Sequence, residues 1–132
     1  MTQEDKELLL KDLCARLPYG VKCVFHSKDG DIPSTVVKID TENKTVSHKP
    51  NGQNQIYFHW IESGNIKPYL RPMSNMTADE RKYYNYLTRL VQDGEAWEHE
   101  VVDWLNTHHF DYRGLIEKGL AFEAPEEMYK TE

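Results

Sequence analysis

The N-terminal stretch has the hydrophobic spacing of an amphipathic helix, with apolar residues recurring at Leu9, Leu10, Leu13, Cys14 and Leu17. Thr2 precedes this stretch as an N-cap, with Asp5 three residues further on. Pro18 and Gly20 then end the pattern. The spacing therefore predicts a helix over 3–16.

After residue 20 the apolar positions recur every second residue, which is typical of strands. Turn-forming residues separate the runs at 27–31, at 41–45 and at Asn51-Gly52. The pattern predicts five short strands, over 21–26, 32–40, 45–49, 55–61 and 65–72. Pro68 and Pro72 restrict the fifth strand to an edge or to a short closing position. Such strands favour a small SH3-like five-stranded barrel or a twisted antiparallel sheet.

Helical spacing returns in the C-terminal part of the chain. Thr77 and Glu80 form a TxxE capping box before an apolar stripe, and Gly94 is placed to stop the helix, which we predict over 78–93. A second helix is predicted over 95–108, with an apolar face made by Trp97, Val101, Trp104, Leu105 and His108.

The stretch after this helix predicts a joint and a short third helix. Asp111 takes an N-cap position before "YRGLIEK", and Phe110 is expected to pack as a wedge between the helices. With Gly119 as the C′ residue, the contact that accompanies a Schellman stop is made by Leu115 and Leu120. In this interpretation His108 is partly buried and His109 faces solvent. The final residues, 126–132, are expected to fray.

The composition is that of a folded and soluble chain. Of its 132 residues, 39% are hydrophobic and 29% are charged. The start, "MTQEDKELLL", lacks a secretory signal pattern, and no apolar run is long enough to span a membrane, so we expect a cytoplasmic protein. Cys14 and Cys23 are expected to be free thiols. We predict an α+β fold in three parts: an N-terminal helix over 1–17, the SH3-like β-barrel over 18–72, and C-terminal helices packed on it over 73–132.

Charge is distributed unevenly along the chain. Residues 18–72 hold seven Lys and Arg against five Asp and Glu, whereas residues 73–132 hold six against thirteen. The net charge of the whole chain is −6. This balance disfavours duplex nucleic acid as a partner of the whole surface, because phosphate contacts need clustered cations.

Two groups of polar residues raise the question of metal-dependent chemistry. The segment "HEVVD" places His99 and Asp103 one helical turn apart with Glu100 beside them, similar to a zinc-protease helix. These residues fall opposite the apolar face of their helix, which favours a solvated surface over a metal site. The other group is His108, His109 and Asp111, for which a joint between helices explains more residues than a ligand set does.

The segment "IYFHWI" is apolar on both faces of its predicted strand, with Ile56, Phe58 and Trp60 on one face and Tyr57, His59 and Ile61 on the other. With Lys49 and Lys67 nearby, Tyr57 and His59 would form a platform on which the bases of single-stranded nucleic acid could stack. Alternatively, one of the helices covers that face of the strand.

Two phrases, "IKPYLRPMSNMT" and "DWLNTHHFDYRGLIEKGLAFEAPEEMY", resemble stretches in small uncharacterised proteins encoded by phages and mobile elements of gut bacteria. The resemblance covers roughly a third of the chain. It implies a bacterial cytoplasmic setting and a role in phage or mobile-element biology. The family carries no assigned activity, cofactor or catalytic residue.

We therefore expect a non-enzymatic binding or adaptor module that contacts a protein partner and needs no cofactor. The acidic C-terminal half motivates this expectation, with Glu98, Glu100 and Asp103 as candidate contact residues. The alternative is binding of single-stranded nucleic acid through Tyr57, His59, Lys49 and Lys67. A more distant alternative is a metal-dependent hydrolase using one of the two histidine groups.

Overall fold

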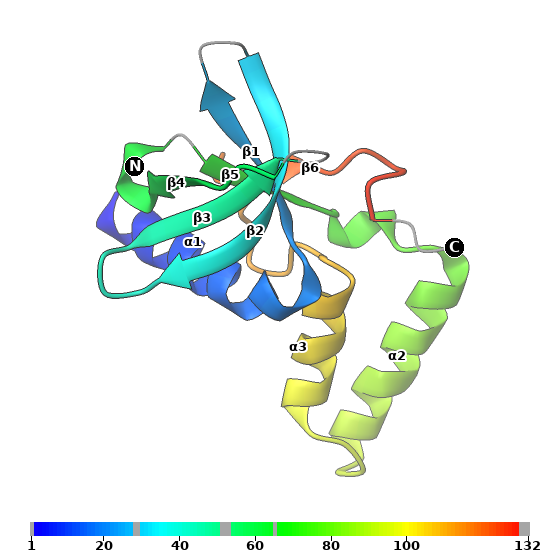
Figure 1. Cartoon of the computed structure of the whole chain (residues 1–132). Coiled ribbons are helices and arrows are strands. Elements are labelled where there is room, and N and C mark those ends of the chain that lie inside the picture. Colours follow the sequence, from blue (N-terminus) through cyan, green and yellow to red (C-terminus); the bar gives the residue numbers. More distant parts are fainter. Residues whose placement is uncertain (1, 28–29, 51–53, 65, 130–132) are drawn as a thin grey trace.

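Figure 1 shows the chain as a computed structural model, which describes residues 2–27, 30–50, 54–64 and 66–129. The protein is α+β, with an N-terminal helix, a six-stranded sheet and a helical hairpin. The α-helices are α1 (Gln3–Arg16), α2 (Ala78–Gln92) and α3 (Glu98–Thr107). The strands are β1 (Lys22–Ser27), β2 (Gly30–Asp40), β3 (Thr45–Pro50), β4 (Tyr57–Trp60), β5 (Ile66–Leu70) and β6 (Phe122–Glu123). Short 3-10 helices follow α1 (η1, Leu17–Tyr19), β4 (η2, Ile61–Ser63) and β5 (η3, Met73–Asn75).

The predicted starts of α1 and α2 are confirmed at the level of single hydrogen bonds. Thr2 caps α1 and Thr77 caps α2, each in a reciprocal capping box with the acid three residues on. Gly94 follows α2 with φ +76°, the left-handed conformation expected at a helix stop. The helix predicted over 95–108 is shorter in the structure, because α3 begins only after Trp97, which is its N-cap.

The sheet is open, with the strand order β4-β3-β2-β1-β5-β6. The expectation of a closed barrel is therefore wrong. Closure would require β4 to pair with β5, but the second edge of β5 is taken by β6. The β5–β6 pair is parallel and the other pairs are antiparallel, so the sheet is mixed. Of the predicted turn at 27–31, Ser27 belongs to β1 and Gly30 and Asp31 belong to β2, whereas 28–29 lie outside the described residues, as does the predicted turn at Asn51-Gly52.

Helix α1 covers one face of the sheet, and in Figure 1 it lies behind β2 and β3. We call this the inner face, and the opposite one the outer face. Leu9 and Leu13 of α1 are fully buried against inner-face side chains and against three residues from the C-terminal segment. The members of this core are Leu9, Leu13, Val21, Cys23, Val36, Val46, Ile61, Ile66, Leu70, Leu115, Leu120 and Ala121. Cys14 and Cys23 are free thiols, as expected.

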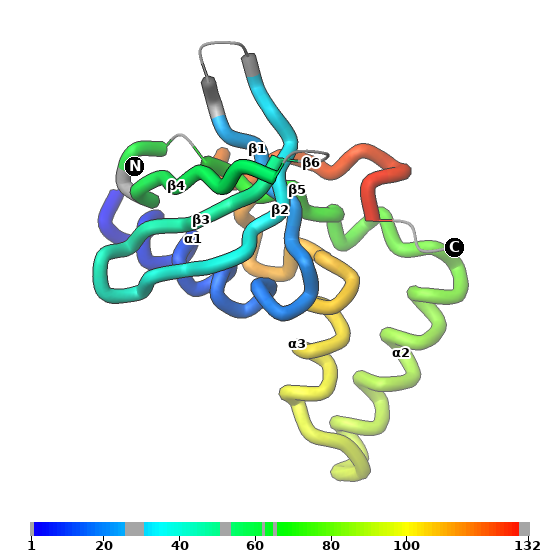
Figure 2. Tube along the Cα trace, viewed as in Figure 1, coloured from blue at the N-terminus to red at the C-terminus, as the bar shows by residue number. Residues whose placement is uncertain are grey.

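The helices α2 and α3 run away from the sheet as a hairpin (Figure 2). A smaller apolar cluster joins them to the body, with Leu87, Val101, Leu105 and Phe110 as its buried members. Phe110 is fully buried and its ring lies 5.7 Å from that of Trp104. The predicted burial of Phe110 is confirmed, but its cluster joins α2 and α3, and the third helix expected on the other side of the wedge is absent from the described residues.

The predicted third helix is replaced by a run of turns. The carboxylate of Asp111 accepts the backbone N–H groups of Leu115 and Ile116, at 2.8 and 3.0 Å. The stop itself has the predicted hydrogen bonds: Leu120 N–H donates to Leu115 C=O and Gly119 N–H to Ile116 C=O. The sequence therefore predicted the ends of this segment correctly and its helical interior incorrectly.

Gly119→Ala is expected to lower the free energy of unfolding by about 1 kcal/mol, since Gly119 has φ +76° and a Cβ there is strained. A Cβ at this position would meet no atom within 4 Å, so the backbone conformation alone sets the cost. Urea unfolding of the variant and of the wild type measures the difference. An unchanged midpoint and slope would contradict the assigned conformation.

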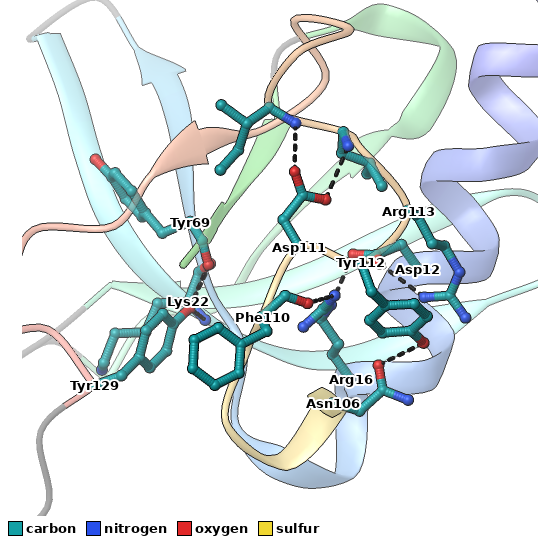
Figure 3. A network of polar contacts seen from close by, with 12 residues as sticks. Asp12, Arg16, Lys22, Tyr69, Asn106, Phe110, Asp111, Tyr112, Arg113 and Tyr129 are labelled. Atoms are coloured by element: carbon teal, nitrogen blue, oxygen red, sulfur yellow. Dashed lines mark hydrogen bonds and ion pairs between the residues drawn. The ribbon is translucent and has the colours of Figure 1, made fainter. Parts of the chain in front are cut away.

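A buried ionic network fastens the C-terminal segment to α1 (Figure 3). Asp12 and Arg16 are both fully buried, and Arg16 Nε donates to Asp12 Oδ2 at 2.9 Å. Arg113 donates to the other carboxylate oxygen at 2.8 Å, and Arg16 Nη2 donates to the C=O of Phe110 at 2.6 Å. The ring of Tyr112 lies 5.4 Å from the Arg16 guanidinium and 4.5 Å from that of Arg113.

Tyr129 is anchored, in contrast to the fraying expected for the final residues. Its hydroxyl accepts the backbone N–H of Lys22 at 2.8 Å and donates to the C=O of Tyr69 at 2.7 Å (Figure 3). Its ring stacks on that of His109 at 3.9 Å. Burial raises the pKa of the Tyr129 hydroxyl, so it remains a neutral donor at physiological pH.

Candidate functional site

The most exposed aromatic side chains of the sheet lie on the outer face of β4, one of its two end strands. Within β4, Phe58 is 59% exposed and Trp60 is 57% exposed. Their rings meet edge to face with centroids 5.5 Å apart. Ile56, just before the strand, is also exposed. An apolar group of this kind on a surface is a candidate binding site.

The strand register places lysines on the same face. Phe58 lies opposite Ser47 of β3, and Ser47 lies opposite Lys38 of β2. Lys49 is two residues from Ser47, so its side chain also points to the outer face. We call Lys38, Lys49, Phe58 and Trp60 the aromatic-lysine face. Lys38 is exposed and Lys49 is half-buried.

Further lysines extend this face across the sheet. Lys22 of β1 lies opposite Thr35 of β2, with its ammonium 3.5 Å from the threonine hydroxyl. Lys67 of β5 has the same orientation, and its ammonium lies 5.2 Å from the centre of the Phe122 ring. Cations therefore occur on β1, β2, β3 and β5, on the side of the sheet that α1 does not cover.

Asp31 and Asp40 of β2 place carboxylates on the outer face, and that of Asp40 is engaged in a turn. Asp40 lies at the end of β2, opposite Thr45 and in the same row as Trp60. It accepts hydrogen bonds from the backbone of Glu42 and from the backbone and side chain of Asn43. The hydrogen bonds from Asn43 contribute most to lowering the pKa of the Asp40 carboxyl. Its charge is therefore partly compensated within the turn.

Tyr57 and His59 lie on the inner face instead. Both are half-buried and form a ring cluster with Phe25 and His48. His48 Nε2 and His59 Nδ1 are 2.8 Å apart. Burial lowers the pKa of both imidazoles, that of His48 to about 4. The four residues expected to share one surface are therefore divided: Lys49 and Lys67 are on the outer face, whereas Tyr57 and His59 are on the inner one.

The acidic residues of α3 are exposed as expected. Glu98, His99, Glu100 and Asp103 all face solvent. Glu100 also accepts the N–H of Trp97 at 2.7 Å and so helps to cap its own helix. Among the described residues, no group of three or more His, Cys, Asp or Glu could hold a metal ion.

The histidines at the joint point in different directions. His108 Nδ1 lies 3.0 Å from the C=O of Trp104, so this side chain stays with its own helix. His109 has φ +61° and is 5% exposed, which corrects the expectation that it faces solvent. Its left-handed backbone turns the ring inward onto Tyr129. Asp111 binds backbone N–H groups instead of an imidazole.

A pocket of about 370 Å³ lies where β5, the start of α2 and the C-terminal segment meet. Arg71 and Glu80 form a two-pronged ion pair on its wall, at 2.9 and 2.6 Å. The hydrogen bonds from Arg71 help lower the pKa of the Glu80 carboxyl to about 2. Because these charges compensate each other, the ion pair gives the pocket little net attraction for a charged ligand.

Comparison of the chain with protein-family models, with curated protein sequences and with solved structures finds no match. No helix in the described part of the chain is long and apolar enough to cross a membrane.

Proposed function

We propose that this chain is a non-enzymatic binding module whose aromatic-lysine face binds single-stranded nucleic acid. The observation that carries the proposal is the pair Phe58 and Trp60, both more than half exposed on one strand face. Residues two apart in a strand are separated by roughly 6.6 Å, so each ring can take its own base. Stacking of this kind is open to any base sequence, because every base has a π face.

The lysines supply the second requirement, which is attraction for phosphates. Lys49 lies one strand away from Phe58 and Lys38 lies two strands away, so the cations lie to one side of the aromatic pair. Adjacent strands are about 4.8 Å apart, so these long side chains can reach the backbone of a stacked strand. A duplex would keep its bases stacked on each other, and the net charge of −6 would oppose extensive wrapping. Single strands are therefore the preferred ligand.

The test measures the fluorescence anisotropy of a labelled oligothymidylate of about 12 nucleotides at low salt. Phe58→Ala and Trp60→Ala should each raise the Kd by roughly 5-fold to 150-fold, since stacking contributes about 1–3 kcal/mol per base. Tyr86→Ala is the matched control, because Tyr86 on α2 is 58% exposed and lies outside this face. Lys49→Ala should reduce the slope of log K against log salt by about 0.7. Equal affinities for the wild type and Trp60→Ala, or no binding by the wild type, would refute the proposal.

A protein partner is the second candidate, in line with the adaptor role expected from the acidic half of the chain. The observation that favours it is Trp97, which is 73% exposed at the start of α3 beside Glu98 and Glu100. Affinity capture from bacterial host cells with Trp97→Ala as control separates the two candidates. A protein captured by the wild type and by Trp60→Ala, but lost with Trp97→Ala, would favour the adaptor role in phage or mobile-element biology.

A further inference from the structure

The free edge of β4 has the features of a strand that pairs with another strand. It is the end strand of the sheet, and among the described residues only β3 pairs with it. The N–H of Ile61 donates to the C=O of Lys44 at 3.0 Å, which fixes the alternation along the strand. By that alternation Tyr57 and His59 direct their backbone groups at β3. Phe58 and Trp60 direct theirs at the free edge.

The side chains of β4 do nothing to block this edge. Proteins commonly protect end strands with lysines, prolines or bulges. The segment from Ile56 to Ile61 contains none of these and no charge. The opposite end strand, β6, differs in each respect: it is two residues long, includes Glu123 and is followed closely by Pro125. By these criteria β4 is less protected against pairing than β6.

We infer that β4 pairs with β4 of a second copy of this chain, antiparallel about a two-fold axis that passes beside Phe58. In such a pair, a residue of the outer face must lie opposite another residue of the outer face. Otherwise the outer face of one sheet would continue into the inner face of the other. With Phe58 opposite its own copy, the outward N–H and C=O of both copies exchange two hydrogen bonds. Ile56 of one chain then faces Trp60 of the other, and Tyr57 faces His59.

The chemistry of these facing pairs is compatible with self-association. Each chain carries a net charge of −6, which opposes the meeting of two copies over most of their surface. The segment from Ile56 to Ile61 is uncharged, so this repulsion is weakest where the two edges meet. The Ile56–Trp60 contacts join apolar side chains that are 59% and 57% exposed in the single chain. The β4 edge of a second copy therefore suits this edge: it is also uncharged, and it offers the N–H and C=O groups that the first edge leaves unpaired within the described residues.

Pairing of this kind happens in the plane of the sheet and leaves the outer face uncovered. The two Phe58–Trp60 pairs would form one continuous aromatic row across the axis. The inference is independent of nucleic-acid binding, because association is measured without oligonucleotide. Dimerisation without oligonucleotide binding would overturn only the proposed function, and oligonucleotide binding by a protein that stays monomeric over the whole concentration range would overturn only this inference.

The test is sedimentation equilibrium over a range of protein concentrations, from about 1 to several hundred μM. The wild type should approach twice the 15.5 kDa mass of one chain. Phe58→Lys should weaken association at least about tenfold, since it places two like charges opposite each other. Tyr86→Lys, at a site of the same exposure, should leave it unchanged. Circular dichroism of both variants establishes that they are folded.

Amide hydrogen exchange of the wild type gives a readout that needs no variant. Exchange at Phe58 and Trp60 should slow as the protein concentration rises, because their N–H groups enter the interface. Exchange at Tyr57 and His59 should be slow at every concentration, since their N–H groups already face β3. A monomeric mass throughout the range, or protection at Phe58 that does not change with concentration, would overturn the inference.

Discussion

Asp12→Ala is expected to lower the free energy of unfolding by about 3–5 kcal/mol, the usual cost of removing one partner from a buried ion pair. Asp12 is the only carboxylate shown to bond Arg16 and Arg113 among the described residues. Without it, two guanidinium groups remain close together, and that of Arg16 is fully buried. Urea unfolding monitored by tryptophan fluorescence measures the loss.

Two controls separate the charge effect from the change in helix α1. Asp12→Asn keeps the size of the side chain and removes its charge, so it should also destabilise the protein strongly. The second control is Glu7→Ala. Glu7 is exposed on the same helix, and its carboxylate accepts a hydrogen bond from Gln3. The substitution should change stability by no more than about 0.5 kcal/mol. A loss below about 1 kcal/mol for Asp12→Ala would contradict the assigned network.

The second large effect is expected on acidification. Burial lowers the pKa of His48 and of His109 to about 4, with the neighbouring charges of His59 and Arg16 respectively adding to the shift. In the unfolded chain a histidine titrates near pH 6.5. Between these values the unfolded chain binds protons that the folded chain does not, so stability must fall as the pH falls from about 6.5 to 4.

The size of the stability loss follows from the difference between the folded and unfolded pKa values of the histidines. Each pKa unit corresponds to about 1.4 kcal/mol, so the two histidines together could remove several kcal/mol of stability. Chemical unfolding at a series of pH values measures it. Glu80 should contribute at a lower pH, because its pKa is lowered to about 2 and its stabilisation is lost only below about pH 4.5.

Substitutions assign the acid effect to particular histidines. His48→Phe keeps a ring against Phe25 and removes one titrating group, so it should reduce the loss between pH 6.5 and pH 4 by less than half, because His109 and His59 also have lowered pKa values. His99→Ala, at an exposed position on α3, should leave the profile unchanged. A wild-type stability that is constant over this range would show that the two buried imidazoles do not differ from those of the unfolded chain.

The parts of the fold that were predicted correctly depend on interactions close in sequence. The caps at Thr2 and Thr77 and the stops at Gly94 and Gly119 involve partners within five residues. The prediction of a third helix after Asp111 was wrong because the local hydrogen bonds are not those of a helix start. Asp111 bonds to N–H groups four and five residues ahead, whereas an N-cap bonds to those two or three residues ahead, and Gly114 between them adopts a left-handed conformation.

The sequence predicted the strand that carries the candidate site, but not which of its two faces is exposed. The aromatic strand and its two faces follow from the alternation in "IYFHWI". Which face is covered depends on the register between β3 and β4, which places Tyr57 beside His48 and Phe58 beside Ser47. A signal was present in the alternation of β3, where the buried Val46 and His48 occupy one face and Thr45 and Ser47 the other. Pairing that face with Tyr57 and His59 would have identified Phe58 and Trp60 as the exposed pair.

The buried network joins residues that lie far apart in the sequence. Arg16 bonds to Phe110 across 94 residues, Arg113 to Asp12 across 101, and the backbone of Lys22 to Tyr129 across 107. During synthesis α1 leaves the ribosome early with a charge pair whose remaining partners do not yet exist. Contacts this distant close last and slow the search for the native state. We therefore expect the native structure to form only after the segment that reaches Tyr129 has left the ribosome.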